Sequence, residues 1–246
     1  MTATINNPVS LEKKIVSATG YRIPLVAGSQ MYSALLVDEK KRVYMATCDL
    51  RRPAYLIRLD PSTGVIERLG NMQDITGQTD PEMIPQSKIH SQLVRDNQGR
   101  IWFGTHNEEM YNAAFGSLDV YPKGFPGGHL INFDPATGRF TDFGVHFPQT
   151  VEWPKNIQEL GLYYLSMTRD PKRDVLYALL GDRIHIAAFD MTNGKLLDCQ
   201  PAPLPYPYAD HLEPRGAGFQ QCRDLRVGAD GQVYTFTHSG QLMRYR

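Results

Sequence analysis

The stretch "KIHSQLVRDNQGRIWFGTH" (residues 88–106) decides the fold. An apolar run leads into the turn Asp-Asn-Gln-Gly, and a second run, rich in β-branched and aromatic residues, follows it. Gly and Asn supply the positive φ that a tight turn needs, and the flanking residues are strand formers. The stretch therefore predicts a β-hairpin with a histidine at each end. It raises the question whether the hairpin brings these two histidines together for chemistry.

The same pattern recurs along the chain, which indicates a repeat architecture. The turn opens with Asp38 in the first copy and with Asp96 in the second. Three copies are followed by a second phrase in which a Gly stands four residues after an Asp, as in Asp60 and Gly64. The copies span residues 30–48, 88–106, 162–180 and 220–238, and the second phrases span residues 55–70, 128–144 and 184–200.

Two hairpins per repeat give four short antiparallel strands, which are typical of a β-propeller blade. We predict an all-β protein: a β-propeller of four-stranded antiparallel blades, with about four to five blades or an incomplete larger ring. Residues 1–246 would form a single domain, in which residues 12–26 are the candidate strand that closes the ring. Otherwise a second copy or a partner chain would complete it, because an open propeller exposes sheet edges. The repeat units lie near residues 28–75, 86–148, 160–200 and 218–246.

Composition excludes several classes of protein. Lys+Arg and Asp+Glu both number 26, so neither a nucleic acid nor a membrane surface is an expected partner. Three widely spaced cysteines, Cys48, Cys199 and Cys222, form neither a disulfide framework nor a zinc pattern. No secretory signal and no membrane-spanning run is present in the sequence. We therefore expect a soluble, cytoplasmic protein.

Strand direction predicts where the histidines lie. In an antiparallel blade, the start of the first strand, the end of the second and the start of the third share one face of the disc. These positions hold His90, His106 and His129 in the second unit. Counting back from each turn places Tyr32, His90 and Tyr164 around the channel mouth, with Arg223 beside the fourth equivalent position, Cys222. An ionisable rim of this kind is a candidate site for chemistry.

Two chemistries suit such a rim. Three imidazoles, with Glu108 or Glu109 near, would suit a divalent transition metal ion bound by His90, His106 and His129. Alternatively, a histidine and a tyrosine exchange a proton while Arg183 or Arg223 neutralises a substrate carboxylate. The second set is what β-elimination from a uronic acid requires. An insertion at residues 107–128, placed over this face, would serve as a lid or specificity loop.

The phrases "DNQGRIWFGTH", "GGHLINFDPATGRFTDFG" and "GADGQVYTFTH" resemble bacterial propellers of the streptogramin-lyase-like and polysaccharide-lyase-like kind. The resemblance is at the level of the repeat and covers most of residues 28–246. It implies a lyase, as in the ulvan and oligogalacturonate lyases, that acts on an oligosaccharide or another small molecule. The chain is shorter than those seven-bladed relatives and has no secretion signal. The implied roles are acid–base catalysis by His90, His106 and Tyr164, and substrate binding by Tyr32, His129, Arg183 and Arg223.

"GRIWFG" also resembles the sensor propellers attached to two-component regulators. Two functions therefore stay open. One is a lyase-like enzyme that removes a proton beside the carboxylate of a sugar or a similar small polar substrate. The other is a non-catalytic binding, scaffold or sensor propeller that is completed by a partner chain.

Overall fold

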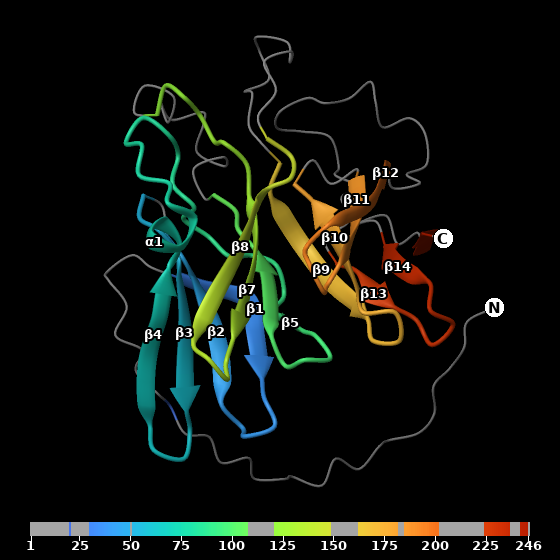
Figure 1. The fold of residues 1–246 in the computed structure, drawn as a ribbon, viewed down its shortest axis with the longest axis horizontal. Coiled ribbons are helices and arrows are strands. Elements are labelled where there is room, and N and C mark those ends of the chain that lie inside the picture. The colour runs from blue at the N-terminus through green and yellow to red at the C-terminus, as the bar shows by residue number, and fades with distance from the viewer. Residues whose placement is uncertain are drawn as a thin grey trace, which may run out of the picture.

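The chain folds into antiparallel sheets that follow one another in chain order across the molecule (Figure 1). Among the described residues, three sheets have four strands and the last has three, and within each sheet the strands pair in sequence order. The fold is therefore the predicted all-β propeller, and the described residues form four blades of an incomplete ring. The computed structural model describes residues 20, 30–49, 51–107, 121–148, 162–181, 185–201, 224–236 and 242–245.

The four sheets are numbered in chain order, and each lies within one sequence repeat. Sheet 1 contains β1 (Gln30–Val37), β2 (Val43–Cys48), β3 (Tyr55–Asp60) and β4 (Val65–Asn71). Sheet 2 contains β5 (Val94–Arg95), β6 (Ile101–Gly104), β7 (His129–Asp134) and β8 (Arg139–Val145). Sheet 3 contains β9 (Tyr164–Asp170), β10 (Val175–Leu180), β11 (His185–Asp190) and β12 (Leu196–Pro201). Sheet 4 contains β13 (Arg226–Val227), β14 (Val233–Phe236) and β15 (Leu242–Tyr245).

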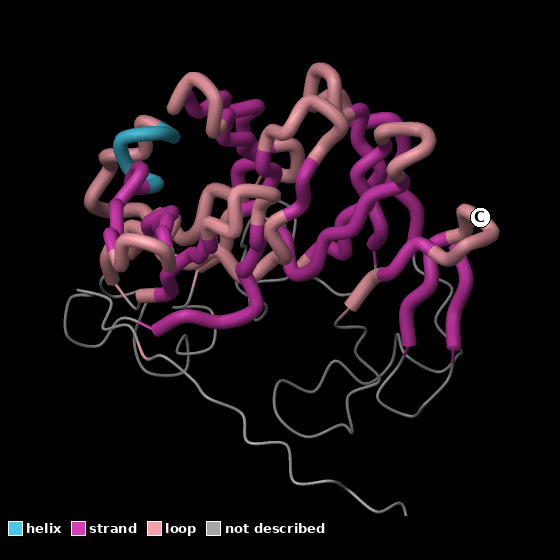
Figure 2. The backbone as a smooth tube through the Cα atoms, turned by 90° about the horizontal axis from the view of Figure 1, so that it is seen from below, coloured by secondary structure: helices cyan, strands magenta, loops and turns pink. Residues whose placement is uncertain are grey.

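Strands make up most of the described backbone, and loops join them at both rims (Figure 2). The one helix among the described residues is the short α1 (Met72–Thr76), which follows β4. The Asn71 side chain caps it by accepting a hydrogen bond from the Asp74 N–H at 2.9 Å. Met72 is fully buried in the core between sheets 1 and 2. The helix therefore closes the outer part of this sheet interface.

The turn between the first two strands of a sheet is fixed by its aspartate. Asp96 Oδ1 accepts the Arg100 N–H at 2.8 Å, while Oδ2 accepts from Arg100 Nε at 2.6 Å and from Trp102 Nε1 at 2.8 Å. In sheet 1, Asp38 makes the same bonds to the N–H and Nε of Arg42, at 2.9 Å and 2.7 Å. The Asp at the start of these turns is thus a structural anchor that closes the hairpin, whereas sheet 4 has Gly228 at this position.

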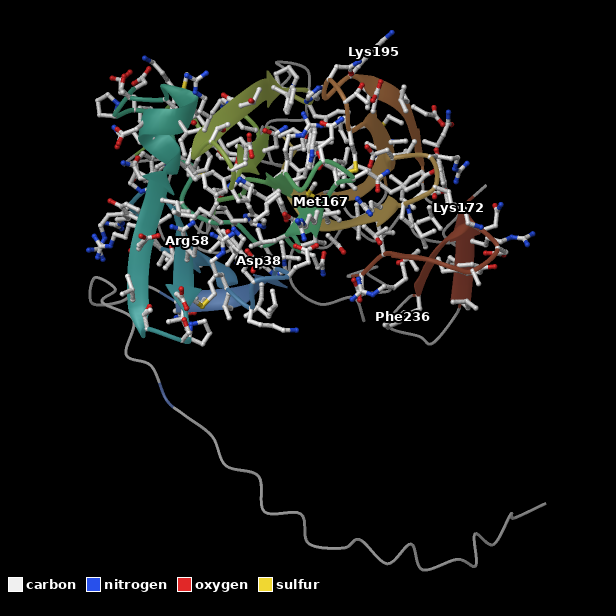
Figure 3. The ribbon with its side chains drawn as sticks, turned by 60° about the horizontal axis from the view of Figure 1, so that its bottom comes forward. Asp38, Arg58, Met167, Lys172, Lys195 and Phe236 are labelled. Carbon is white, nitrogen blue, oxygen red and sulfur yellow. The ribbon has the colours of Figure 1, made fainter. Side chains whose placement is uncertain are left out.

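Apolar side chains fill the space between neighbouring sheets. Tyr44 and Phe133 lie in the core between sheets 1 and 2, and Trp102 lies in the core between sheets 2 and 3. Figure 3 shows Met167 near the middle of the molecule, where sheets 2 and 3 meet. The Trp102 ring stacks on Phe143 with centroids 4.9 Å apart. Burial of these faces is the main force that holds successive sheets together.

The innermost strands contain extra residues near their starts. In sheet 1, Met31 pairs with Thr47 and Leu35 pairs with Met45, so β1 has two more residues than β2 between these pairs. Lys88 pairs with His106 and Val94 pairs with Trp102, so the start of the second inner strand also carries two extra residues. In β9, Ser166 pairs with Leu179 and Tyr164 pairs with Leu180, which leaves one extra residue. The single extra residue in β9 turns the side chains at the start of that strand to the opposite face, because side chains alternate with a period of two.

Several predictions fall outside the described residues. The candidate closing strand at residues 12–26 is one of them, and most of residues 200–220, which would add a fifth blade, are another. The greater part of the insertion at residues 107–128 is a third. In the part of the chain that the structure describes, no helix is long and apolar enough to cross a membrane.

Candidate functional site: the histidine rim

The starts and ends of the strands in sheet 2 meet at one rim. The backbones of Lys88 and His106 exchange hydrogen bonds of 3.0 Å and 2.7 Å. The Thr105 N–H donates to the His129 carbonyl at 3.0 Å. The antiparallel topology therefore gathers the three strand ends as expected. We call residues 88–90, 105–107 and 129 the histidine rim.

The hairpin of residues 88–106 does bring its two histidines together. The rings of His90 and His106 have centroids 5.9 Å apart and are tilted by 36°. His90 Nδ1 lies 3.0 Å from the Leu165 carbonyl oxygen of sheet 3. Because a carbonyl oxygen only accepts hydrogen bonds, Nδ1 of His90 donates, and the neutral ring keeps its lone pair on Nε2. His90 is half-buried and is oriented by the neighbouring blade.

His106 lies deeper than His90 and contacts a different tyrosine from the predicted one. Its side chain is fully buried, and its ring centroid is 3.6 Å from that of Tyr163. Tyr163 is itself 3% exposed and belongs to the core between sheets 3 and 4. The histidine pair therefore continues into an aromatic contact with sheet 3. The doublet "YY" at residues 163–164 was the only signal for it in the sequence.

Tyr164 does not stand with this pair at the channel mouth, which corrects the position predicted for it. Its side chain is fully buried in the core between sheets 2 and 3, against Gly104. The physical reason is the extra residue in β9, which turns Tyr164 to the opposite face from the one a regular strand would give. Burial raises the pKa of its phenol far above the ordinary value, so the group is poorly suited to proton transfer near neutral pH.

His129 shares the rim but points to the other face of sheet 2. Thr105 pairs with His129, and paired residues face the same way, so the next residue, His106, faces the opposite way. His129 Nδ1 donates to Asp142 Oδ2 at 2.8 Å. The carboxylate is held in turn by the Gly144 N–H, which donates to Oδ1 at 2.8 Å. The three predicted histidines thus form a pair and a separate histidine–aspartate contact.

His146 is not among the residues predicted for the site, yet it belongs to a polar contact between sheets 2 and 3. Its Nε2 donates to the Gly194 carbonyl at 3.0 Å, so its Nδ1 is the acceptor for the Tyr164 hydroxyl at 3.4 Å. The ring also packs edge-on against Phe189 at 5.0 Å. Burial lowers the pKa of this imidazole, against opposing effects of Gly194 and Asp142. No sequence pattern marks the residue.

A second feature missed from the sequence is a polar contact that joins three blades along their inner strands. Gln92 Oε1 accepts from Ser166 Oγ at 2.9 Å and from the Met167 N–H at 2.8 Å. Gln92 Nε2 donates to Asp224 Oδ1 at 3.3 Å. Gln92, Ser166 and Asp224 each stand four residues before the start of a turn, which is at Asp96, Asp170 and Gly228, respectively. Counting back four residues from each turn would therefore have grouped them. We call Gln92, Ser166 and Asp224 the inner clasp.

The remaining predicted binding residues are placed only in part. Arg183 and Arg223 lie outside the described residues. The backbone of Tyr32 belongs to β1, within the segment that carries two extra residues, and its side chain is outside the description. The substrate-binding roles of these three residues remain predictions.

A metal site of three histidines has no support in the geometry. Among the described residues, which include His90, His106 and His129, no three His, Cys, Asp or Glu side chains are grouped so that they could hold a metal ion. The opposite directions of His106 and His129 explain this result. Glu108 and Glu109, the carboxylates considered beside them, lie outside the described residues.

A comparison with known protein families agrees with the predicted propeller repeats. A family model described as two component regulator propeller matches residues 83–107, which include both His90 and His106. This match covers one repeat. No curated protein matches the chain.

Several solved structures are similar in fold. The extracellular domain of a putative hybrid two component system from B. thetaiotaomicron is 11% identical over 86% of this chain and 20% of its own, with a TM-score of 0.49. A luciferin-regenerating enzyme is 12% identical over 89% of this chain and 57% of its own, with a TM-score of 0.48. A streptogramin B lyase is 14% identical over 88% of this chain and 58% of its own, with a TM-score of 0.45. This chain thus spans a fifth to just over half the length of these proteins.

Proposed function

We propose that the histidine rim binds a small polar substrate with a carboxylate, such as a uronic sugar, and acts on it by acid–base β-elimination. One observation carries the proposal: His90 and His106 lie 5.9 Å apart, and His90 is oriented by the Leu165 carbonyl. An imidazole whose Nδ1 donates to a carbonyl carries its lone pair on Nε2, and this nitrogen is suited to abstract a proton.

The chemistry assigns a role to each ring. His90 Nε2 removes the proton from the carbon next to the substrate carboxylate. The electron pair left behind forms a carbon–carbon double bond, and the bond to the leaving oxygen breaks. That oxygen takes a proton from an acid, for which protonated His106 is the candidate. A cation must also neutralise the carboxylate, and the predicted Arg183 or Arg223 is the proposed source.

The two histidines also differ in how deeply they are buried. His90 is half-buried, whereas His106 is fully buried. We therefore expect the substrate to meet His90 first, and His106 to act only if the substrate reaches beneath it. Tyr164 has no part in this proposal, because its phenol is buried and its pKa is raised.

Ultraviolet absorbance tests the enzyme directly, since elimination creates a double bond conjugated with a carboxylate. The purified chain is incubated with oligogalacturonate and with ulvan oligosaccharides. We expect new absorbance from the wild type and at least a hundredfold loss in His90→Ala. His185→Ala is the matched control, because His185 begins β11 of sheet 3 as His129 begins β7 of sheet 2. Equal turnover by His90→Ala, or no turnover by any form, would contradict the proposal.

A non-catalytic sensor or scaffold propeller is the second candidate. Two observations favour it: the matched repeat is of the two component regulator kind, and His106 is fully buried. Isothermal titration calorimetry with the same oligosaccharides separates the two functions. Binding that His90→Ala abolishes, without any new absorbance, would support a sensor. If the wild type shows no binding and no turnover, both functions of the rim are excluded for these ligands.

A further inference from the structure

The fold uses one kind of contact between sheets again and again. Each sheet has a forward face, which packs on the next sheet in the chain, and a backward face, which packs on the preceding one. Leu56 and Ala46 are paired on the forward face of sheet 1, and Leu130 and Gly104 are paired on that of sheet 2. Leu56, Ala46 and Leu130 are fully buried by the next sheet.

The forward face of sheet 4 has the same design, and no sheet of the described residues packs against it. Leu242 pairs with Phe236 at the position where Leu56 pairs with Ala46 and Leu130 pairs with Gly104. Leu242 is 70% exposed and Phe236 is 57% exposed, whereas Leu130 is fully buried. Figure 3 shows Phe236 on the outermost sheet. Two large apolar side chains at interface positions therefore face solvent.

The backward face of sheet 1 also carries exposed apolar side chains. Leu35 stands three residues before the turn aspartate Asp38, as Leu93 stands three residues before Asp96. Leu93 is 4% exposed in the interface between sheets 1 and 2, whereas Leu35 is 56% exposed. Val37, two residues further along β1, is 52% exposed. The middle of this face is buried: Met45, Ile57 and Leu59 are at most 6% exposed and form a core cluster that draws on sheet 1 alone among the described residues. The exposed part of the face is therefore at Leu35 and Val37.

The exposed parts of these two faces do not meet within the described chain. Sheet 1 and sheet 4 lie at opposite ends of the row of sheets (Figures 1 and 2). One end of the row is a forward face and the other is a backward face. These are the two kinds of surface that pack together at each of the three internal contacts between sheets.

We propose that a second copy of this chain covers both faces, so that the forward face of sheet 4 in each copy packs on the backward face of sheet 1 in the other. Two identical junctions of this kind turn two rows of four sheets into one closed ring. Each junction repeats the interface that the fold already uses, and it covers Leu35, Phe236 and Leu242. The proposal is independent of the chemistry assigned to the histidine rim.

Solution size tests the proposal. Light scattering after size-exclusion chromatography of the 246-residue chain should give a dimer at micromolar concentration. Leu35→Glu and Leu242→Glu should each weaken dimerisation at least tenfold, because each places a charge in both junctions. Leu197→Glu is the matched control: Leu197 is 52% exposed on β12, away from the end faces, and the dimer should persist.

A mixing experiment separates this arrangement from the alternatives. Leu35→Glu keeps an intact forward face and Leu242→Glu keeps an intact backward face, so an equal mixture retains one good junction and should recover dimer. A dimer through two copies of the same face would be lost in only one variant, which would overturn the proposal. A wild-type monomer at all concentrations would overturn it as well. A monomer whose melting temperature falls sharply in both variants would show instead that the chain covers these faces itself.

Discussion

The two rims of the sheets are built on different principles. At the turn rim, Asp38, Asp96 and Asp170 each accept a hydrogen bond from the Nε of a nearby arginine, at 2.6 to 2.7 Å. The same chemistry recurs because each hairpin must be closed in the same way. At the histidine rim, His106 stands where sheet 1 has Cys48 and sheet 3 has Gly181, and these three residues share no chemistry. Repetition thus marks the residues that build the fold, and departure from it marks the candidate site.

Loss of the turn anchor in sheet 2 should have the largest effect on stability. Asp96 is buried, and Asp96→Ala would leave Trp102 Nε1 and the Arg100 guanidinium without their acceptor. We expect the free energy of unfolding to fall by about 3–5 kcal/mol, as for other buried charge contacts that lose one partner. Urea denaturation followed by tryptophan fluorescence measures it.

An aspartate in an exposed turn is the control for Asp96. Asp60 also closes a hairpin, where it accepts from the Ser62 N–H and hydroxyl, but these bonds are exposed to water. Asp60→Ala should therefore lower stability much less than Asp96→Ala. Equal losses would mean that burial of the aspartate does not determine its contribution.

The turn rim could be predicted from the sequence because its signal is local. An Asp at the start of the turn and apolar residues on either side are enough to define a hairpin, and the second phrase defines the next one. The sheets therefore match the repeats. The missing sheet contacts at both ends could not be predicted, because exposure of Leu35 and Leu242 depends on which other sheets are present.

The histidine rim was predicted only in part, for two physical reasons. Counting from the turn assumes a regular strand, and the extra residue in β9 turned Tyr164 into the core and left Tyr163 beside His106. Side-chain alternation along paired strands also separates two of the predicted histidines. The pairing of Thr105 with His129 requires that His106 and His129 point to opposite faces.

Loss of the inner clasp should have the next largest effect. Gln92→Ala removes two accepted hydrogen bonds from sheet 3 and one donated to Asp224 in sheet 4. We expect a loss of about 2 kcal/mol, because the Ser166 hydroxyl and the Met167 N–H lose a buried acceptor. Gln98→Ala, in the exposed turn of the same sheet, is the control and should change stability little. A neutral Gln92→Ala would show that apolar packing alone holds the inner strands.

One glycine near each rim offers a smaller, matched test. Gly138 in the β7–β8 turn has a φ of 72°, Gly144 in β8 has a φ of 81°, and an added Cβ meets nothing within 4 Å at either site. Alanine at each should cost about 1 kcal/mol of backbone strain. Only Gly144→Ala should also shift the NMR signal of the His129 Nδ1 proton, because Gly144 holds Asp142. An equal shift in Gly138→Ala would contradict this link.

The smallest expected effect is a pH dependence from His146. Burial lowers its pKa in the folded protein, so between that pKa and the ordinary value of about 6.5 the unfolded chain binds more protons. The stability that neutral His146 contributes is fully present above about pH 6.5 and is lost as the pH falls toward the folded pKa. This stability is on the order of 1 kcal/mol or less, because the ring is only half-buried. Denaturation at a series of pH values, with His146→Gln as reference, isolates this group from the other histidines. The wild type should lose more stability than the variant on going from pH 7.5 to about pH 5. Parallel curves would mean that protonation of His146 is not coupled to the contact between Tyr164 and sheet 2.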